Sequence, residues 1–144
     1  MKDIIVKHYE KIEPEVNTQN GNSFAVKNII PPDMTDKCCA NFVEVEPGNF
    51  AYGYHYHEEN EEIFYIISGK ASVKTLQGEI FLTQGDVICF PANENGSHVI
   101  SNPSKDEKLL YLDIGSANKP DVVHFTGTNQ GMVITKNEMY KFSK

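Results

Sequence analysis

The sequence lacks several features that mark common classes of protein. No apolar run is long enough to cross a membrane, and the first residues contain neither an extended apolar segment nor a small-residue cleavage site. We therefore expect a cytoplasmic protein with no membrane partner. Basic charge is also scarce: the net charge is −7, which argues against nucleic acid and against anionic membrane surfaces. The absence of a glycine-rich phosphate loop and of a basic cluster weakens the case for a sugar-phosphate substrate.

Cysteine is sparse as well. Only three cysteines occur, Cys38, Cys39 and Cys89, and two of them are adjacent. An odd set of this kind does not indicate a disulfide framework, and it fits thiols that are kept reduced inside a cell. Because each thiol lies in an apolar, strand-like context, we expect all three to be buried and unreactive.

Helical periodicity is missing too, apart from one short turn that residues 136–142 could form. What the chain has instead is a series of short apolar segments separated by glycine-containing or polar turns. Expected strands span residues 52–57, 62–67, 71–76, 79–82, 86–90, 97–101 and 108–114, with further candidates at 4–6, 24–30 and 132–134, whereas residues 14–23 have the composition of a loop. Many short strands at this spacing predict an all-β sandwich or barrel, and 144 residues suit one domain.

Two histidines one residue apart, His55 and His57, are the first candidates for a functional site. On a strand, residues i and i+2 point to the same face about 6–7 Å apart, so both imidazoles would enter one space. Imidazole nitrogen binds divalent transition metals, and a carboxylate from the acidic residues at 58–62 could complete the shell. Taken alone, such a pair more often lies on the surface. His98, at the start of a later apolar segment, is a candidate for a further ligand of the same metal.

These segments resemble the two sequence motifs of the cupin superfamily, and more narrowly its small single-domain bacterial members with no assigned reaction. The first motif, G-x5-H-x-H-x(3,4)-E-x6-G, is matched by His55, His57, Glu62 and Gly69. The second, G-x5-P-x-G-x2-H-x3-N, is matched by Gly85, Pro91, His98 and Asn102. The chain departs from the pattern at Gly48, one residue too far from His55, and in the loop after Pro91, which is two residues longer and has Gly96 as its glycine. The resemblance is close over residues 48–102.

The resemblance implies a double-stranded β-helix that holds a metal ion through His55, His57, Glu62 and His98. Three imidazoles and one carboxylate suit Fe, Mn, Ni, Co or Zn, and the sequence does not choose among these metals. We expect a single domain over residues 1–144, with an N-terminal arm or edge strand at 1–30 and a tail at 116–144. Cupins of this size often form homodimers, and the segment 63–67 is apolar on both faces, so its outer face needs cover.

Three functions remain open at this point. The first is a metal-dependent enzyme that acts on a small polar molecule, an oxo acid, a diol or a sugar, as a dioxygenase, decarboxylase or isomerase. The second is a non-catalytic module on the same barrel that binds a sugar or another small molecule, and the third is a protein whose metal is structural. Catalytic residues are not identified; candidates for the pocket or for acid–base roles are Tyr52, Tyr54, Asp113 and His124.

Glu61 and Glu62 compete as the carboxylate ligand, and the motif spacing to Gly69 favours Glu62. A two-residue turn at this glycine would place Tyr65 opposite Lys74 on the next strand. Since an unpaired ammonium group is costly to bury, Lys74 should face solvent. Tyr65, opposite Lys74, and Glu61, four residues before Tyr65 on the same strand, should then face solvent as well. We therefore expect Glu62 to point into the barrel.

Overall fold

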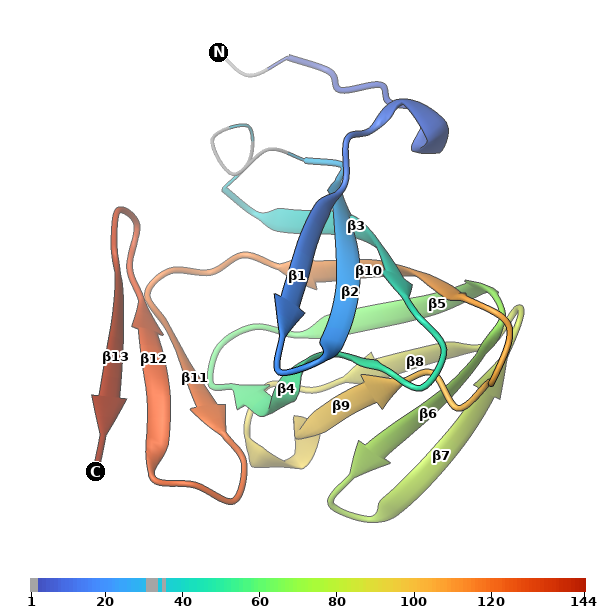
Figure 1. The fold of residues 1–144 in the computed structure, drawn as a ribbon. Coiled ribbons are helices and arrows are strands. Elements are labelled where there is room, and N and C mark those ends of the chain that lie inside the picture. Colours follow the sequence, from blue (N-terminus) through green and yellow to red (C-terminus); the bar gives the residue numbers. More distant parts are fainter. Residues whose placement is uncertain (1–2, 31–33, 35) are drawn as a thin grey trace.

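Two antiparallel β-sheets face each other in the computed structural model, which describes residues 3–30, 34 and 36–144 (Figure 1). The first sheet has the strand order β1-β2-β3-β10-β5-β8, with bounds β1 (Glu15–Gln19), β2 (Asn22–Asn28), β3 (Cys38–Val45), β5 (Glu62–Ser68), β8 (Val87–Phe90) and β10 (Leu109–Ser116). The second has the order β13-β12-β11-β4-β9-β6-β7, with bounds β4 (Phe50–His57), β6 (Lys70–Thr75), β7 (Gly78–Thr83), β9 (His98–Ser101), β11 (Asp121–Phe125), β12 (Gln130–Ile134) and β13 (Met139–Ser143). Two single-turn 3-10 helices are also present, η1 (Tyr9–Lys11) and η2 (Glu94–Gly96). Within the described residues, no helix has the length and apolarity needed to cross a membrane.

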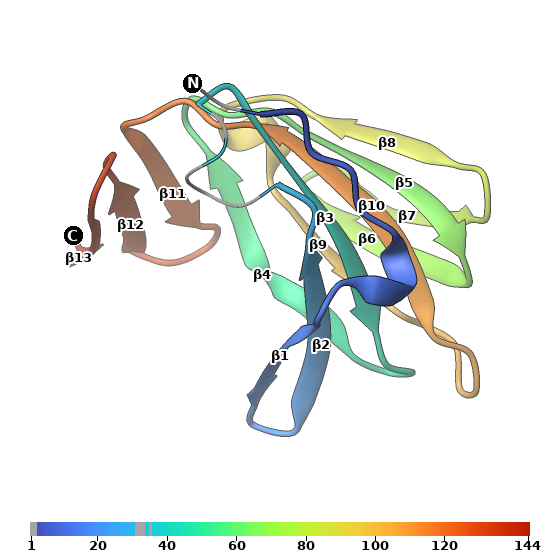
Figure 2. The ribbon, with the colours of Figure 1, turned by 90° about the horizontal axis from the view of Figure 1, so that it is seen from above.

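From β3 to β11 the chain passes back and forth between the sheets, and only the β6–β7 hairpin stays in one of them. This alternation is the double-stranded β-helix. Two views show β11, β12 and β13 gathered on one side of the molecule and β6 and β7 on the other (Figures 1 and 2). The predicted all-β fold is confirmed, and the seven strands expected between residues 52 and 114 are present as β4 to β10.

The core forms between the sheets because side chains alternate along each strand. On β10, Leu109 and Tyr111 are fully buried, and they pair with the fully buried Val45 and Val43 of β3. Burial of each large apolar side chain contributes about 1.5–3 kcal/mol. The same alternation turns a polar residue of β10, Asp113, towards the interior, where its exposed fraction is 7%.

The N-terminal region contains a hairpin that sequence reasoning misses. The expectation of a loop over residues 14–23 is wrong, because β1 pairs there with β2 through a turn at Asn20-Gly21. Both turn residues have positive φ, 52° and 80°, as a type I′ turn requires, and asparagine followed by glycine favours that turn. This dipeptide was the available signal for a hairpin. The strand expected at 4–6 is absent, and Ile4 and Val6 are 93% and 89% exposed.

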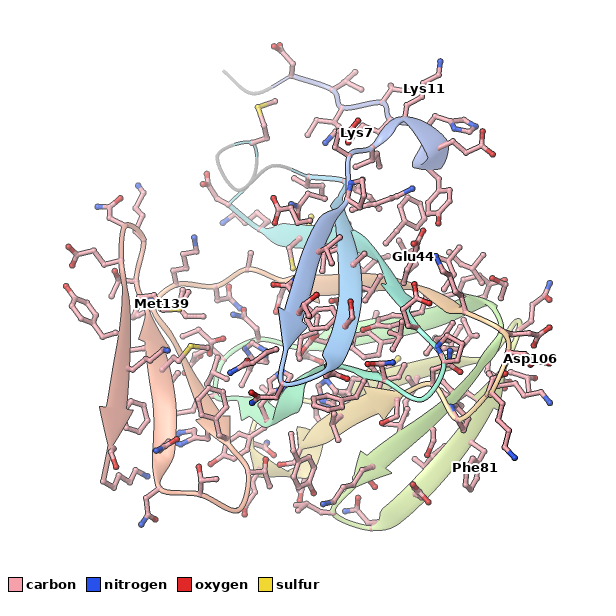
Figure 3. The ribbon with its side chains drawn as sticks, in the orientation of Figure 1. Lys7, Lys11, Glu44, Phe81, Asp106 and Met139 are labelled. Carbon is pink, nitrogen blue, oxygen red and sulfur yellow. The ribbon has the colours of Figure 1, made fainter. Side chains whose placement is uncertain are left out.

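The tail also ends differently from the prediction. The helical turn expected within residues 136–142 is wrong, because β13 occupies most of this segment and pairs with β12. The strand expected at 132–134 is confirmed as part of β12. Figure 3 shows Met139 of β13 at the periphery of the molecule, where it is 60% exposed. An edge strand of this kind buries too little to need an apolar alternation, so its sequence does not indicate a strand.

Gly69 marks a crossing between the sheets and not the expected β5–β6 hairpin turn. β5 pairs with β8 and β10, whereas β6 pairs with β7 and β9. Gly69 has a φ of +84°, and a Cβ atom there would lie 2.4 Å from the Lys108 carbonyl oxygen. The cross-strand argument for the orientation of β5 is therefore wrong, but its outcome agrees with the structure: Phe64 is 2% exposed and Tyr65 is 41% exposed.

The cysteines are less buried than expected. Cys38 and Cys89 are exposed and Cys39 is half-buried, so the expectation that all three are buried is wrong. All three belong to the described part of the chain, and none of them forms a disulfide.

Candidate metal centre

Four predicted ligands meet inside the barrel, although they come from three strands and both sheets. His55 and His57 lie on β4, and His98 begins β9, which pairs with β4 so that His98 is directly opposite His55. Glu62 begins β5 in the facing sheet. One carboxylate from the first sheet thus meets three imidazoles from the second.

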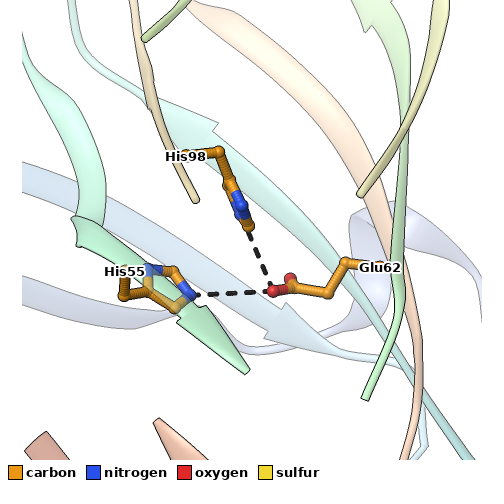
Figure 4. Close-up of side chains that lie close together, drawn as sticks. All are labelled: His55, Glu62 and His98. Atoms are coloured by element: carbon orange, nitrogen blue, oxygen red, sulfur yellow. Dashed lines mark ion pairs between the residues drawn. The ribbon is translucent and has the colours of Figure 1, made fainter. Parts of the chain in front are cut away.

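The ligand atoms of His55, Glu62 and His98 lie close enough to share one ion, and Nε2 of His57 also approaches Glu62. Oε1 of Glu62 is 3.1 Å from Nε2 of His57 and 3.6 Å from Nε2 of both His55 and His98. Figure 4 shows the His55, Glu62 and His98 side chains pointing towards one another, and their ligand atoms all lie within 4.8 Å of one another. Two atoms that each lie about 2.1 Å from one ion are about 3.0–3.4 Å apart at octahedral or tetrahedral angles. The observed separations are close to this range.

Each imidazole is oriented through its other ring nitrogen. Nδ1 donates a hydrogen bond in all three cases: His55 to the Gly53 carbonyl at 2.6 Å, His98 to the Gly96 carbonyl at 2.8 Å, and His57 to Oδ2 of Asp121 at 2.6 Å. A carbonyl or carboxylate oxygen accepts, so Nδ1 must carry the proton. Nε2, which faces Glu62, is then the nitrogen that can bind a metal.

Asp121 is the residue of this centre that sequence reasoning misses. It begins β11, which pairs with β4, and its side chain is 2% exposed. Besides His57, the carboxylate accepts hydrogen bonds from the Asn60 side chain at 2.8 Å and from the Glu59 backbone N–H at 3.0 Å. Burial alone raises the pKa of Asp121, but these hydrogen bonds outweigh it and lower the pKa. Asp121 lies 64 residues from His57, and no local pattern in the sequence indicates the pair.

Two buried polar atoms of the centre fit a bound cation. Within the described residues, neither Oε1 of Glu62 nor Nε2 of His98 forms a well-aligned hydrogen bond, although Nε2 of His57 lies 3.1 Å from Oε1, and both atoms are inaccessible to solvent. Buried polar atoms in native proteins are nearly always paired. An ion between them would satisfy both atoms, so the residues present fit a metal.

The protonation states around the centre follow from burial and from neighbouring charges. Burial raises the pKa of Glu62, but the approach of the His55 and His57 rings lowers it more, so the pKa lies well below its ordinary value. Burial lowers the pKa of His98 to about 4, against the opposing effect of Glu62. For His57, the effect of burial is outweighed by the Asp121 and Glu62 carboxylates, which raise the pKa to about 9. A metal would therefore find an ionised carboxylate and a neutral His98, and would displace a proton from His57.

The centre opens into a cavity of about 770 Å³. Two of the further candidates, Tyr52 and Asp113, line this cavity. Tyr54 and His124 are not among its described lining residues: the ring of Tyr54 lies under the Lys74 ammonium at 4.6 Å, and Nε2 of His124 contacts Oε1 of Glu58 at 2.6 Å.

Asp113 is the second carboxylate in the cavity. Burial and the charge of Glu62 raise its pKa well above the ordinary value, and its Oδ1 atom is buried without a hydrogen-bond partner among the described residues. Burial followed by the charge of Asp113 likewise raises the pKa of Tyr52. A buried carboxyl group with an unpaired oxygen can bind a polar group of a ligand.

Comparison with known proteins shows which family the sequence matches. The sequence model of the Cupin domain family matches residues 41–115, which is more than half of the chain. An oxalate decarboxylase of Arthroderma benhamiae is 32% identical over 106 residues, which are 70% of this chain and 23% of that protein. The chain thus spans about a quarter of the length of the curated relatives it matches.

Solved structures share the fold at lower sequence identity. A sugar phosphate isomerase from Silicibacter pomeroyi has a TM-score of 0.82 at 20% identity, covering 95% of this chain and 91% of that chain. A protein from Thermotoga maritima, described as a predicted oxalate decarboxylase, has a TM-score of 0.69 at 22% identity, covering 79% of this chain and 100% of that chain. These likenesses concern the fold alone.

Proposed function

This chain belongs to the Cupin domain family, and from that membership we propose that it is a metal-dependent enzyme acting on a small, oxygen-bearing molecule. The ligands that we assign to the metal are His55, His57, Glu62 and His98. The observation that carries the proposal is the orientation of the three imidazoles, each held through Nδ1 so that Nε2 faces the Glu62 carboxylate at the cavity.

The metal, which we propose to be Fe, Mn, Ni, Co or Zn, would act as a Lewis acid towards oxygen atoms of the bound molecule. The residues of the chain have separate tasks. Asp121 holds the His57 ring and its tautomer, and the Gly53 and Gly96 carbonyls do the same for the other two imidazoles. Asp113, in the same cavity, would bind a hydroxyl or carbonyl group of the substrate and act in proton transfer.

Within the class of dioxygenases, decarboxylases and isomerases, the reaction that we favour is a decarboxylation or an isomerisation of an oxo acid, diol or sugar. The matched oxalate decarboxylase and the structurally similar sugar phosphate isomerase support this choice as relatives with those names. A non-catalytic module that binds the same kind of molecule is the second candidate, because the donor set and the cavity would serve binding equally well.

Metal analysis and a turnover screen test the proposal. We expect the purified protein, after loading with Fe(II), Mn(II) or Ni(II), to convert at least one small acid, diol or sugar and to lose this activity with a chelator. His57→Ala should remove most of the metal and the activity. Saturable binding without turnover would favour the binding module, and full metal occupancy in His57→Ala would contradict the ligand assignment.

A further inference from the structure

Apart from the three imidazoles assigned to the metal, the described lining of the cavity beside the candidate metal centre contains acidic groups and no basic side chain. Its described lining residues include the carboxylates of Glu62 and Asp113 and no lysine. The sequence contains no arginine, so the chain has no guanidinium group with which to bind a carboxylate or phosphate through two parallel hydrogen bonds. A divalent metal would supply positive charge, and Glu62 already balances part of it. The site therefore has little charge with which to compensate a dianionic ligand.

One part of the lining is polar but uncharged. The β1–β2 hairpin contributes Asn17, Thr18, Gln19 and Asn20, and every residue of β1 is exposed. A side-chain amide both donates and accepts hydrogen bonds, as a hydroxyl group of a ligand does. These residues thus suit a ligand with several hydroxyl groups.

Another part of the lining is apolar. Val123 and Phe125 of β11 and Met132 and Ile134 of β12 border the same cavity. Contact between apolar side chains and the C–H groups of a ligand lowers the free energy, whereas burying a charged group against apolar side chains raises it. A ligand that fits both parts of the lining has hydroxyl groups on one side and a C–H face on the other.

Asp113 adds a directional contact inside the cavity. Its Oδ1 atom is buried and has no hydrogen-bond partner within the described part of the chain, and the residue is 7% exposed. A hydroxyl group of a bound molecule would supply the missing partner, whereas a phosphate or carboxylate group would bring a further negative charge beside Glu62.

We propose that the ligand of this cavity is an uncharged polyhydroxy compound of sugar size, and that phosphate esters and dicarboxylates are disfavoured. Among the reactions proposed above, this ligand selects isomerisation of a sugar or diol over decarboxylation of an oxo acid. The inference rests on the proposed function in placing this ligand beside the metal centre. Its hydroxyl groups face the centre, Asp113 and the amides of the hairpin, and its C–H face packs on the apolar wall. The cavity, at about 770 Å³, is of the size that holds organic ligands much larger than oxalate.

Calorimetric titration of the Mn(II)-loaded and the metal-free protein tests this inference. The probes are neutral hexoses and cyclic polyols, the 6-phosphates of the same hexoses, and succinate. We expect at least one neutral compound to bind about tenfold or more tightly than its phosphate. In the metal-free protein, the neutral compound should again bind more tightly than the phosphate. Tighter binding of the phosphate or of succinate would overturn the inference, and so would the absence of binding by every neutral compound. Metal content measured on the same samples separates this outcome from a failure of the proposed function, which would appear as a protein that takes up no metal.

A lysine placed on the hairpin provides a matched test. Asn17→Lys, at an exposed position of β1 that lines the cavity, should raise the affinity for the hexose phosphate about tenfold and leave that for the neutral hexose unchanged or lower. Gln77→Lys, at an exposed turn between β6 and β7 outside this cavity, should change neither affinity. Equal effects of the two substitutions would show that the hairpin does not contact the ligand, and this result would overturn the inference.

Discussion

At the scale of single residues, the chemistry of the centre depends on atoms that do not face the metal position. Each imidazole has its Nδ1 proton committed to an oxygen atom, and only His57 uses a carboxylate, that of Asp121, for this purpose. A carboxylate partner fixes the ring and also strengthens the basicity of Nε2. The residues that orient the ligands should therefore matter for metal affinity almost as much as the ligands themselves.

The adjacent pair Glu61 and Glu62 offers a direct test of the ligand assignment. Glu62→Gln should weaken metal binding by more than about 100-fold, because it removes the carboxylate whose Oε1 lies within 3.6 Å of Nε2 of all three imidazoles. Glu61→Gln, at an exposed position next to it, should change the affinity little. Competition with a coloured chelator measures both affinities. The opposite ranking would mean that the interior face of β5 has been assigned incorrectly.

Asp121→Asn should lower metal affinity by about 10–100-fold while leaving all four ligands in place. The amide can still accept a hydrogen bond from His57, but it lacks the charge that makes the imidazole a stronger ligand. Glu59→Gln is the control, because the Glu59 side chain is exposed and only its backbone N–H contacts Asp121. Unchanged affinity after Asp121→Asn, measured in the same chelator assay, would assign Asp121 to folding alone.

Cys39 provides a pH-dependent readout outside the metal centre. Burial, followed by the charges of Asp113 and Glu62, raises the pKa of the Cys39 thiol from 9.0 to about 11. The folded chain thus favours the protonated thiol. This preference contributes to the free energy of unfolding in full below pH 9.0, where the thiol is protonated in the folded and in the unfolded chain, and the contribution is lost as the pH rises through about 11. Alkylation by iodoacetamide should remain slow at Cys39 up to pH 9.0 and accelerate towards pH 11. Peptide mass spectrometry follows the reaction with the same peptide of the urea-unfolded protein as reference, and a half-maximal rate at Cys39 below pH 9.0 would contradict the prediction.

At the scale of elements, two glycine-containing turns decide how the strands connect. Asn20-Gly21 closes the β1–β2 hairpin beside the cavity, and Gly69 carries the chain from β5 in one sheet to β6 in the other. The crossing at Gly69 passes so close to Lys108 that a side chain has no room. Gly69 thus fixes the end of β5, the strand that begins with Glu62.

Gly69→Ala should destabilise the protein by about 2–4 kcal/mol, because it adds a left-handed backbone penalty to an overlap with the Lys108 carbonyl group. Gly127→Ala is the matched control: Gly127 also has a positive φ, +80°, but nothing lies within 4 Å of its Cβ position. The control should cost only about 1–2 kcal/mol. Urea denaturation gives both free energies of unfolding, and equal losses would show that the crossing tolerates a side chain.

At the scale of the whole molecule, the outer face of the first sheet is apolar over several strands. Ile63 and Tyr65 of β5 are each 41% exposed, Val87 of β8 is 56% exposed and Ile114 of β10 is 39% exposed. The strand register pairs Ile63 with Ile114 and Tyr65 with Val87, so the four side chains form one continuous patch. Contiguous apolar patches on a soluble protein often mark an interface.

We predict that a second copy of the chain covers this patch in a homodimer. Tyr65→Lys should shift the protein towards the monomer, because it places a charge within the patch. Phe81→Lys is the control, since Phe81 is 69% exposed but lies on β7 of the other sheet, at the periphery of the molecule (Figure 3). Sedimentation equilibrium at micromolar concentration measures the mass of each protein, and a monomeric wild-type chain would contradict the prediction.

Local patterns in the sequence were enough to predict much of the fold and the chemical type of the centre. The side-chain period of a strand places His55 and His57 on one face and separates Glu61 from Glu62, whatever the strand pairs with. The seven central strands were recognisable for the same reason, because their apolar segments and turns are properties of neighbouring residues. The β1–β2 hairpin was not predicted, although its signal, Asn20-Gly21, is equally local.

The pairing of distant segments was decided only by the tertiary structure. β5 pairs with β8 and β10 and not with the β6 strand that follows it, because the chain crosses between sheets where a short hairpin was equally compatible with the sequence. Asp121 reaches His57 because β11 pairs with β4, and Asp113 meets Glu62 because β10 pairs with β5. Such contacts depend on how two sheets close around one core, and residues far apart in the chain carry no local signal of that closure.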